Sequence, residues 1–156
     1  MLELLAAEDG TPVTADDVSR LIARTELRNI WVDEIQGGPV GLPPAELELH
    51  IRAMAPSFAL AAEDRLLLVR FEHIVSSVTA PAGEDPQDPD PELLRVAHVA
   101  QFDIQGDDPI RHDVVAAWID TNVYFMVYPY VREAIHSLTR LLGLPSLVLG
   151  YLKRQI

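Results

Sequence analysis

Few residues in this sequence of 156 amino acids have the types and spacing that chemistry requires. The absence of cysteine excludes disulfides and thiolate metal sites, and the chain has neither a glycine-rich phosphate-binding loop nor a GxSxG motif. The adjacent pair His112-Asp113 could supply half of a metal or acid–base site, but no second ligand has a supporting spacing. A surface histidine at the start of a helix is the better interpretation, and we expect no metal and no cofactor.

An enzyme would need a histidine or carboxylate that points into the fold, and His98 is the best candidate. It shares the apolar face of its predicted strand with Val96 and Ala100. A small sheet wrapped by helices also describes cone-shaped enzyme folds that bury a ligand, so a small-ligand enzyme remains an alternative. A lone inward histidine is more often a hydrogen-bonded core residue, however, and we predict that the protein is not an enzyme.

Composition limits the partners that the protein can have. The net charge is -12, and acid in this excess repels phosphates. We therefore expect that the protein does not bind nucleic acid directly through a basic patch. The longest apolar run, from Val123 to Val131, is broken by Pro129 and is shorter than the roughly 20 residues of a membrane span. No signal peptide is evident at the N-terminus. We expect a single cytoplasmic domain, 1–156, that does not bind membranes.

The elements that must position any functional residue begin with a helix and a strand. Thr14 precedes Asp17 by three residues, the spacing of a capping box, and predicts a short helix over residues 15–25. The stretch LRNIWVDEIQ follows and predicts a strand that ends at the glycine pair 37–38.

Three further strands are predicted from alternation and from β-branched runs. They are ELELHIRA, RLLLVRFEHIVSSV and ELLRVAHVAQFDI, which begin at residues 46, 65 and 92. Four strands without an intervening helix favour an antiparallel meander or Greek key. The acidic, proline-rich segment 81–92 cannot offset its ordering entropy by burial, and we interpret it as a mobile loop inside the domain.

After Gly106 the hydrophobic period changes from strand-like to helical. A short helix around Trp118 is predicted, then a longer one capped by Asn122 that kinks or begins near Pro129 and ends at Gly143. Its apolar stripe contains Tyr124, Val127, Tyr128, Val131, Ile135, Leu138 and Leu142. The predicted fold class is α+β: a four-stranded antiparallel sheet with C-terminal helices packed on one face, and a short N-terminal helix.

Two motifs near the C-terminus carry a resemblance to a known family. The hexapeptide YPYVRE, from Tyr128 to Glu133, followed by an apolar helix and LPSLVL, from Leu144 to Leu149, resembles the signature of the SecB family. The resemblance covers roughly residue 28 to the end. It implies a molecular chaperone, a homotetramer built as a dimer of dimers, that holds non-native chains in long apolar grooves without nucleotide or catalysis.

The N-terminal helix and the segment RLIARTELRNI resemble more closely the SecB-like chaperones of toxin-antitoxin-chaperone operons. That resemblance implies that the partner is the C-terminal segment of an aggregation-prone antitoxin. General protein export remains the alternative, with delivery of preproteins to SecA through an acidic sheet face to which Glu46, Glu48 and Glu72 could contribute.

The resemblance also implies site residues. The peptide-binding groove is expected at Val40, Leu42, Tyr124, Tyr128, Leu144, Leu147, Val148 and Tyr151, and the oligomer interface at Val131, Arg132, Ile135 and Leu138. With apolar walls and an acidic surrounding surface, the groove should take an extended apolar segment flanked by neutral or basic residues.

Overall fold

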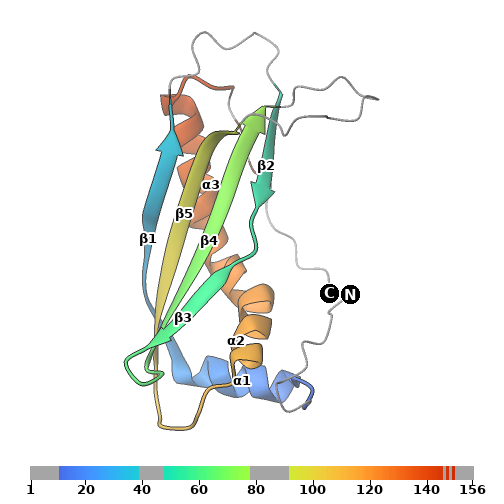
Figure 1. Cartoon of the computed structure of the whole chain (residues 1–156), viewed down its shortest axis with the longest axis vertical. Coiled ribbons are helices and arrows are strands. Elements are labelled where there is room, and N and C mark those ends of the chain that lie inside the picture. The colour runs from blue at the N-terminus through green and yellow to red at the C-terminus, as the bar shows by residue number, and fades with distance from the viewer. Residues whose placement is uncertain (1–10, 39–47, 78–91, 146, 148, 150–156) are drawn as a thin grey trace. The chain divides into compact units, whose positions relative to one another are not determined.

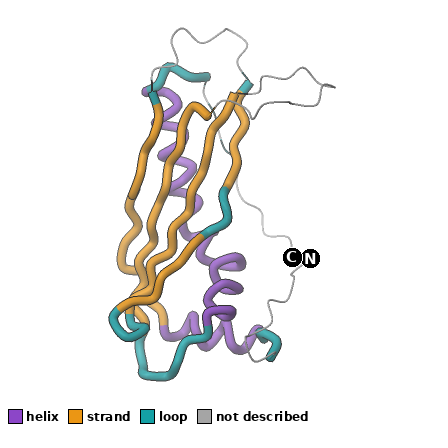
Figure 2. Tube along the Cα trace, viewed as in Figure 1, coloured by secondary structure: helices purple, strands orange, loops and turns teal. Residues whose placement is uncertain are grey.

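The computed structural model describes residues 11–38, 48–77, 92–145, 147 and 149, and its helices and strands give an α+β fold (Figures 1 and 2). Among these residues no helix is long and apolar enough to cross a membrane. In chain order the elements are α1 (Ala15–Arg24), β1 (Thr25–Gly37), β2 (Leu49–Ala53), β3 (Ser57–Ala61), β4 (Leu66–Ser77), β5 (Glu92–Ile104), α2 (His112–Trp118), the π-helix η1 (Ile119–Val123) and α3 (Tyr124–Leu141).

The sheet has five strands where the sequence predicted four. Its order is β1-β5-β4-β2, and β3 also pairs with β4. Both short strands run antiparallel to β4, with Ala53 opposite His73 and Ser57 opposite Arg70. Pro56 lies between β2 and β3. It has no backbone N–H to donate to β4, so it separates the β2–β4 pairing from the β3–β4 pairing.

The described chain forms two compact units. The first contains Met1–Trp31, Pro56–Arg70 and Val99–Val127, and the second contains Val32–Ala55, Phe71–His98 and Tyr128–Ile156. The strands β1, β4 and β5 and the helix α3 contribute residues to both. A single domain over 1–156 stays a prediction, and the acidic segment 81–92 lies outside the described residues except for Glu92, the first residue of β5.

In the first unit the predicted N-terminal helix is confirmed, together with its cap. The Thr14 hydroxyl oxygen accepts a hydrogen bond from the Asp17 backbone N–H at 3.2 Å, and the Asp17 carboxylate accepts one from the Thr14 N–H at 3.0 Å. At the other end of α1, the Arg24 guanidinium donates to the carbonyl oxygens of Gln105 and Asp108 at 2.7 and 2.9 Å. These bonds fix the helix to the segment that follows β5.

The prediction that Asn122 caps the long helix is wrong. Asn122 lies inside η1, and the flanking residues Trp118 and Tyr124 both have right-handed helical dihedral angles. A cap needs a residue that leaves the helical region, whereas a π-turn accommodates an extra residue without a break. The helical chain therefore continues from α2 through η1 into α3, and Pro129 lies inside α3.

In the second unit α3 runs along one face of the strands (Figure 1). Gly37, the last residue of β1, is placed where space is tight: a Cβ atom there would lie 3.2 Å from the Leu93 carbonyl oxygen and 3.3 Å from a methyl carbon of Leu142. Glycine at this position therefore lets the strand end come close to its neighbour and to the residue after α3.

Candidate peptide-binding surface

The side of α3 that faces inward in the second unit is formed by Val131, Ile135 and Thr139, whose exposed fraction is 0%. Two of these, Val131 and Ile135, were predicted to contact a second copy of the chain. Because they have no exposed surface left, a partner could reach only the other two predicted interface residues, Arg132 and Leu138, which are half-buried. An oligomer interface on α3 stays a prediction, with Arg132 and Leu138 as its remaining candidate residues.

The chain turns back sharply at the end of α3. Gly143 has a φ of 70°, the left-handed conformation that glycine adopts most readily, and its N–H donates to the Arg140 carbonyl oxygen at 3.1 Å. The Leu144 N–H donates to the Thr139 carbonyl oxygen at 2.9 Å. The two bonds satisfy carbonyls that the helix end would otherwise leave unpaired, and they direct the following residues back along the helix. Leu144 and Leu149 are buried there, and Leu147 is half-buried.

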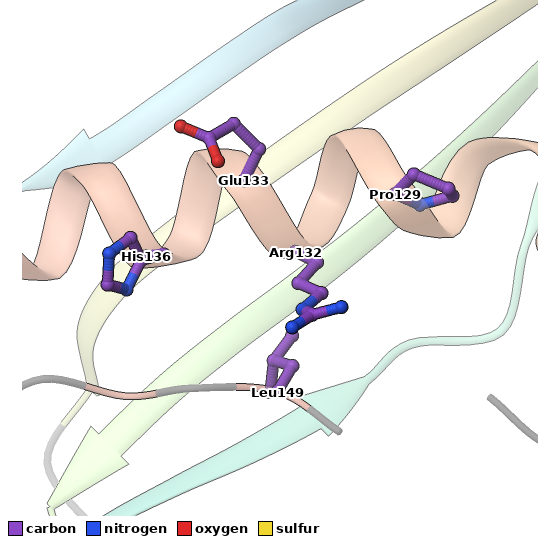
Figure 3. Close-up of a pocket in the computed structure, with 5 residues that line it drawn as sticks. All are labelled: Pro129, Arg132, Glu133, His136 and Leu149. Carbon is purple, nitrogen blue, oxygen red and sulfur yellow. The ribbon is translucent and has the colours of Figure 1, made fainter. Parts of the chain in front are cut away.

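A pocket of about 300 Å³ lies between α3 and this returning segment (Figure 3). Pro129, Arg132 and His136 line it from one side of the helix, since positions three and four apart share a helix face. Leu149 lines it from the returning segment, and the Arg132 side chain extends toward that leucine. Glu133 is the fifth described residue that lines it. The pocket thus combines apolar walls with ionisable groups.

A different side of α3 leaves apolar surface uncovered. Tyr130 is 52% exposed and Leu141 is 82% exposed, and with Ala134 and Ser137 they follow the spacing of one helix face. The second unit also exposes Val32 and Ile35 on β1 and Met54 after β2. Single exposed apolar residues are ordinary, but a helix face that ends in a nearly fully exposed leucine offers surface for another polypeptide.

The structure places four of the eight predicted groove residues. Tyr124, in the first unit, is half-buried, as are Tyr128 and Leu147 in the second unit, and Leu144 is buried. The remaining four, Val40, Leu42, Val148 and Tyr151, lie outside the described residues. Their assignment to a groove stays a prediction.

Sequence reasoning missed Leu149, Tyr130 and Leu141 as surface or pocket residues. Leu149 could have been found, because it alternates with Leu147 in an extended segment and so shares its face. Tyr130 and Leu141 lie off the apolar stripe of α3, and only their exposed fractions in the structure identify them as uncovered apolar side chains.

His98, the candidate for an enzyme, is a core residue. Its exposed fraction is 2%, like that of His73 on the neighbouring strand β4. Burial, together with the charge of His98, lowers the pKa of His73 to about 4, and burial also lowers the pKa of His98. A side chain so enclosed cannot touch a substrate. We expected a hydrogen-bonded core histidine. His98 is in the core, but its Nδ1 atom makes no hydrogen bond within the described residues.

His112 and Asp113 do not form a ligand pair in the first unit. The Asp113 carboxylate accepts hydrogen bonds from Arg111 at 2.7 and 3.2 Å and from the Val114 N–H at 2.9 Å, and these bonds lower its pKa. The His112 ring meets the edge of Phe58, with 5.8 Å between ring centroids. Across the described parts of the chain, no three histidine, aspartate or glutamate side chains are grouped as a metal site requires.

The acidic sheet face predicted for SecA is partly neutralised. Arg95 on β5 forms ion pairs with Glu72 and with Glu92, the latter through hydrogen bonds of 2.7 and 2.9 Å. These bonds to Arg95 lower the pKa of Glu92. Glu48 is exposed, and Glu46 lies outside the described residues. Of the three predicted acids, Glu72 is therefore occupied by a partner within the chain.

The fold matches that of a solved chaperone. The SecB-like chaperone Rv1957 of Mycobacterium tuberculosis, in complex with a ChAD peptide from the HigA1 antitoxin, is 24% identical in sequence to this chain, with a TM-score of 0.73 over 90% of this chain and 99% of the other. A protein of unknown function from Streptococcus agalactiae is 13% identical, with a TM-score of 0.37 over 81% of this chain and 97% of that one. That score is too low to support any conclusion.

No family model and no curated protein matches the sequence. The match to the mycobacterial chaperone confirms, at the level of the fold, the resemblance that the YPYVRE and LPSLVL motifs predicted.

Proposed function

We propose that this protein is an ATP-independent chaperone that holds an aggregation-prone polypeptide, the antitoxin of a toxin-antitoxin-chaperone system, in an extended conformation. The client would lie on the apolar surface that α3 and the returning segment form in the second unit. The observation that carries the proposal is the combination of a SecB-like fold with an uncovered apolar face on one side of α3 and a pocket on another. The mycobacterial chaperone of the same fold was solved with an antitoxin peptide bound, which supports an antitoxin as the client.

The chemistry of the surface suits an extended chain better than a small molecule. Exposed side chains such as Tyr130 and Leu141 present apolar area without enclosing a cavity, and the pocket beside Arg132 is small. Burying one apolar client side chain contributes about 1.5 to 3 kcal/mol before ordering costs, so tight binding requires several anchors. Such binding needs no nucleotide, because it depends only on apolar burial.

We also propose that the protein assembles as a homotetramer in the cytoplasm. β1 lies at one end of the strand order of the described residues, and it exposes Val32 and Ile35. Long edge strands with apolar side chains are surfaces that proteins cover by pairing. Covering β1 with a further copy would remove the apolar surface that Val32 and Ile35 leave exposed, while the Tyr130–Leu141 face stays open for the client.

General export with delivery to SecA is less favoured. Glu72, one of the acids that would face such a partner, is engaged by Arg95. No catalytic role is proposed, since both histidines of the sheet core are enclosed.

The test of the proposed function is the suppression of aggregation. Any antitoxin found to be encoded beside this chain would be diluted from denaturant with the purified protein, without nucleotide, while light scattering is recorded. We expect scattering to fall to baseline near equimolar protein, and the double variant Tyr128→Asp, Leu147→Asp to lose this effect. Ile22→Asp is the matched control, because Ile22 is an exposed apolar residue of α1 in the first unit. Unchanged scattering with the wild-type protein would show that the proposed function is wrong.

A further inference from the structure

The Tyr130–Leu141 face of α3 carries two charged side chains of opposite sign. Glu133 lies three residues after Tyr130, and Arg140 lies seven residues after Glu133, so both belong to the same side of the helix as the exposed tyrosine and leucine. Both charged residues are exposed, and all four positions fall within the second unit. The face therefore has a negative and a positive group between two apolar ends.

The Glu133 carboxylate is oriented by its own helix. It accepts a hydrogen bond from the Ser137 hydroxyl at 2.9 Å, and it is directed away from the Arg132 guanidinium (Figure 3). It is the one acid among the 18 residues of α3, in a chain where acids outnumber lysine and arginine by 24 to 12. Within the described residues neither Glu133 nor Arg140 forms an ion pair. Each of these charges can therefore meet a group of opposite sign on a partner.

The spacing of the two charges matches an extended polypeptide. Seven residues of helix correspond to about 10 Å along the axis. A chain in the polyproline II conformation, which is common in unfolded segments, rises about 3.1 Å per residue and returns to the same side every third residue. Two client residues three positions apart can therefore lie over Glu133 and Arg140 at once. The eleven residues from Tyr130 to Leu141 span about 16.5 Å, which leaves room for one apolar client residue beyond each charge.

We propose that the Tyr130–Leu141 face recognises an extended client segment in which a basic and an acidic residue, three positions apart, lie between apolar anchors. The inference rests on the proposed function, which it makes more specific. Glu133 pairs with the basic residue and Arg140 with the acidic one, while the anchors are buried against Tyr130 and Leu141. Exposed ion pairs contribute little each, so these pairs select the position and direction of the client more than they strengthen binding.

This preference differs from the one that the net charge alone would give. A chain with a net charge of -12 attracts basic segments over its whole surface, and the attraction rises with each added lysine. At the Tyr130–Leu141 face, however, a second lysine would meet Arg140 and be repelled. The expectation of neutral or basic flanking residues is then incomplete, because an acid is accepted beside Arg140.

The test uses fluorescein-labelled peptides of one apolar sequence, blocked at both ends, with binding followed by anisotropy at physiological salt. Two positions three residues apart are occupied by Lys and Glu, by two Lys, by two Glu or by two Gln. We expect the Lys/Glu peptide to bind more tightly than the other three, and about fivefold more tightly than the Gln/Gln peptide. Tightest binding of any other peptide, or equal binding of all four, would overturn the inference and leave the proposed function standing. Failure of all four to bind would instead contradict the proposed function.

Charge reversal separates recognition from a structural role. Arg140→Glu should turn the preference to the Lys/Lys peptide, and Glu133→Lys should turn it to the Glu/Glu peptide, because each variant gives the face two charges of one sign. Arg52→Glu is the matched control: Arg52 is an exposed residue of β2 in the second unit, and its reversal changes the net charge as much as that of Arg140. This control should still prefer the Lys/Glu peptide. If one reversal alters folding in circular dichroism, the other decides, and an unchanged Lys/Glu preference in a folded reversal variant would overturn the inference.

Discussion

Acid should destabilise this protein in a pH range where most carboxylates are still ionised, because His73 must stay neutral in the folded core. Burial, with a smaller contribution from the neighbouring His98, lowers the pKa of His73 from 6.5 to about 4. In the unfolded chain His73 takes up a proton as the pH falls through about 6.5, whereas in the folded chain it does so only near 4. Proton binding therefore favours the unfolded state, and stability is lost between these two values.

The size of the effect follows from the shift in pKa. A shift of one unit corresponds to about 1.4 kcal/mol, so His73 alone should lower the free energy of unfolding by about 2 kcal/mol between pH 7 and pH 5, and by about 3 kcal/mol once the pH reaches 4. The pKa of His98 is lowered by burial too, which adds to the loss in the same direction.

The measurement is urea unfolding at pH 7 and pH 5, at one protein concentration because assembly changes apparent stability. In His73→Leu the drop in the free energy of unfolding between the two pH values should shrink by about 2 kcal/mol, since the variant has no group to protonate in the unfolded chain. His50→Gln is the matched control, because His50 is an exposed residue of β2. The same drop in His73→Leu as in the wild-type protein would refute the burial account.

Three further predictions concern packing, capping and assembly. Gly37→Ala should lower the free energy of unfolding by about 1 to 3 kcal/mol in urea titrations, because the added Cβ would crowd Leu93. At Gly38 the same change should cost much less, since no atom of the described residues, apart from its chain neighbours, lies within 4 Å of the new Cβ, and equal losses at the two glycines would contradict this reasoning. Thr14→Ala should lower the thermal midpoint through a loss of about 1 kcal/mol, and an unchanged midpoint would mean that the capping box adds nothing. Ile35→Asp on β1 should shift the mass from light scattering toward smaller species, whereas an unchanged mass would exclude this exposed side chain from the interface.

Local signals in the sequence were sufficient for most elements. The Thr14–Asp17 spacing predicted α1, and the β-branched and alternating runs predicted β4 and β5 within a few residues. The strand β3, which follows the break at Pro56, was not predicted. It is only five residues long and consists mostly of small residues, which give a weak strand signal. Asn122 was misassigned because a residue with cap chemistry can also lie inside a π-turn, where tertiary packing and not local preference decides.

The candidate site was less predictable than the fold. The motif resemblance located α3 and the returning leucines, but which of their side chains have free surface depends on packing between segments far apart in sequence. Val131 and Ile135 were expected to meet a partner and are buried, while Tyr130 and Leu141 project outward. The pocket beside Arg132 depends on how Leu149 returns to the helix, which no local pattern specifies.

The central claim is that a client's apolar side chains are buried on α3 and its returning segment. Calorimetric titration of the antitoxin's C-terminal segment into the purified protein at several temperatures tests it most directly, because burial of apolar surface gives a negative heat-capacity change. We predict such a change for the wild-type protein and for Ile22→Asp, and loss of binding in a correctly assembled Tyr128→Asp, Leu147→Asp variant. Binding without a heat-capacity change, or full binding by the folded double variant, would contradict the claim.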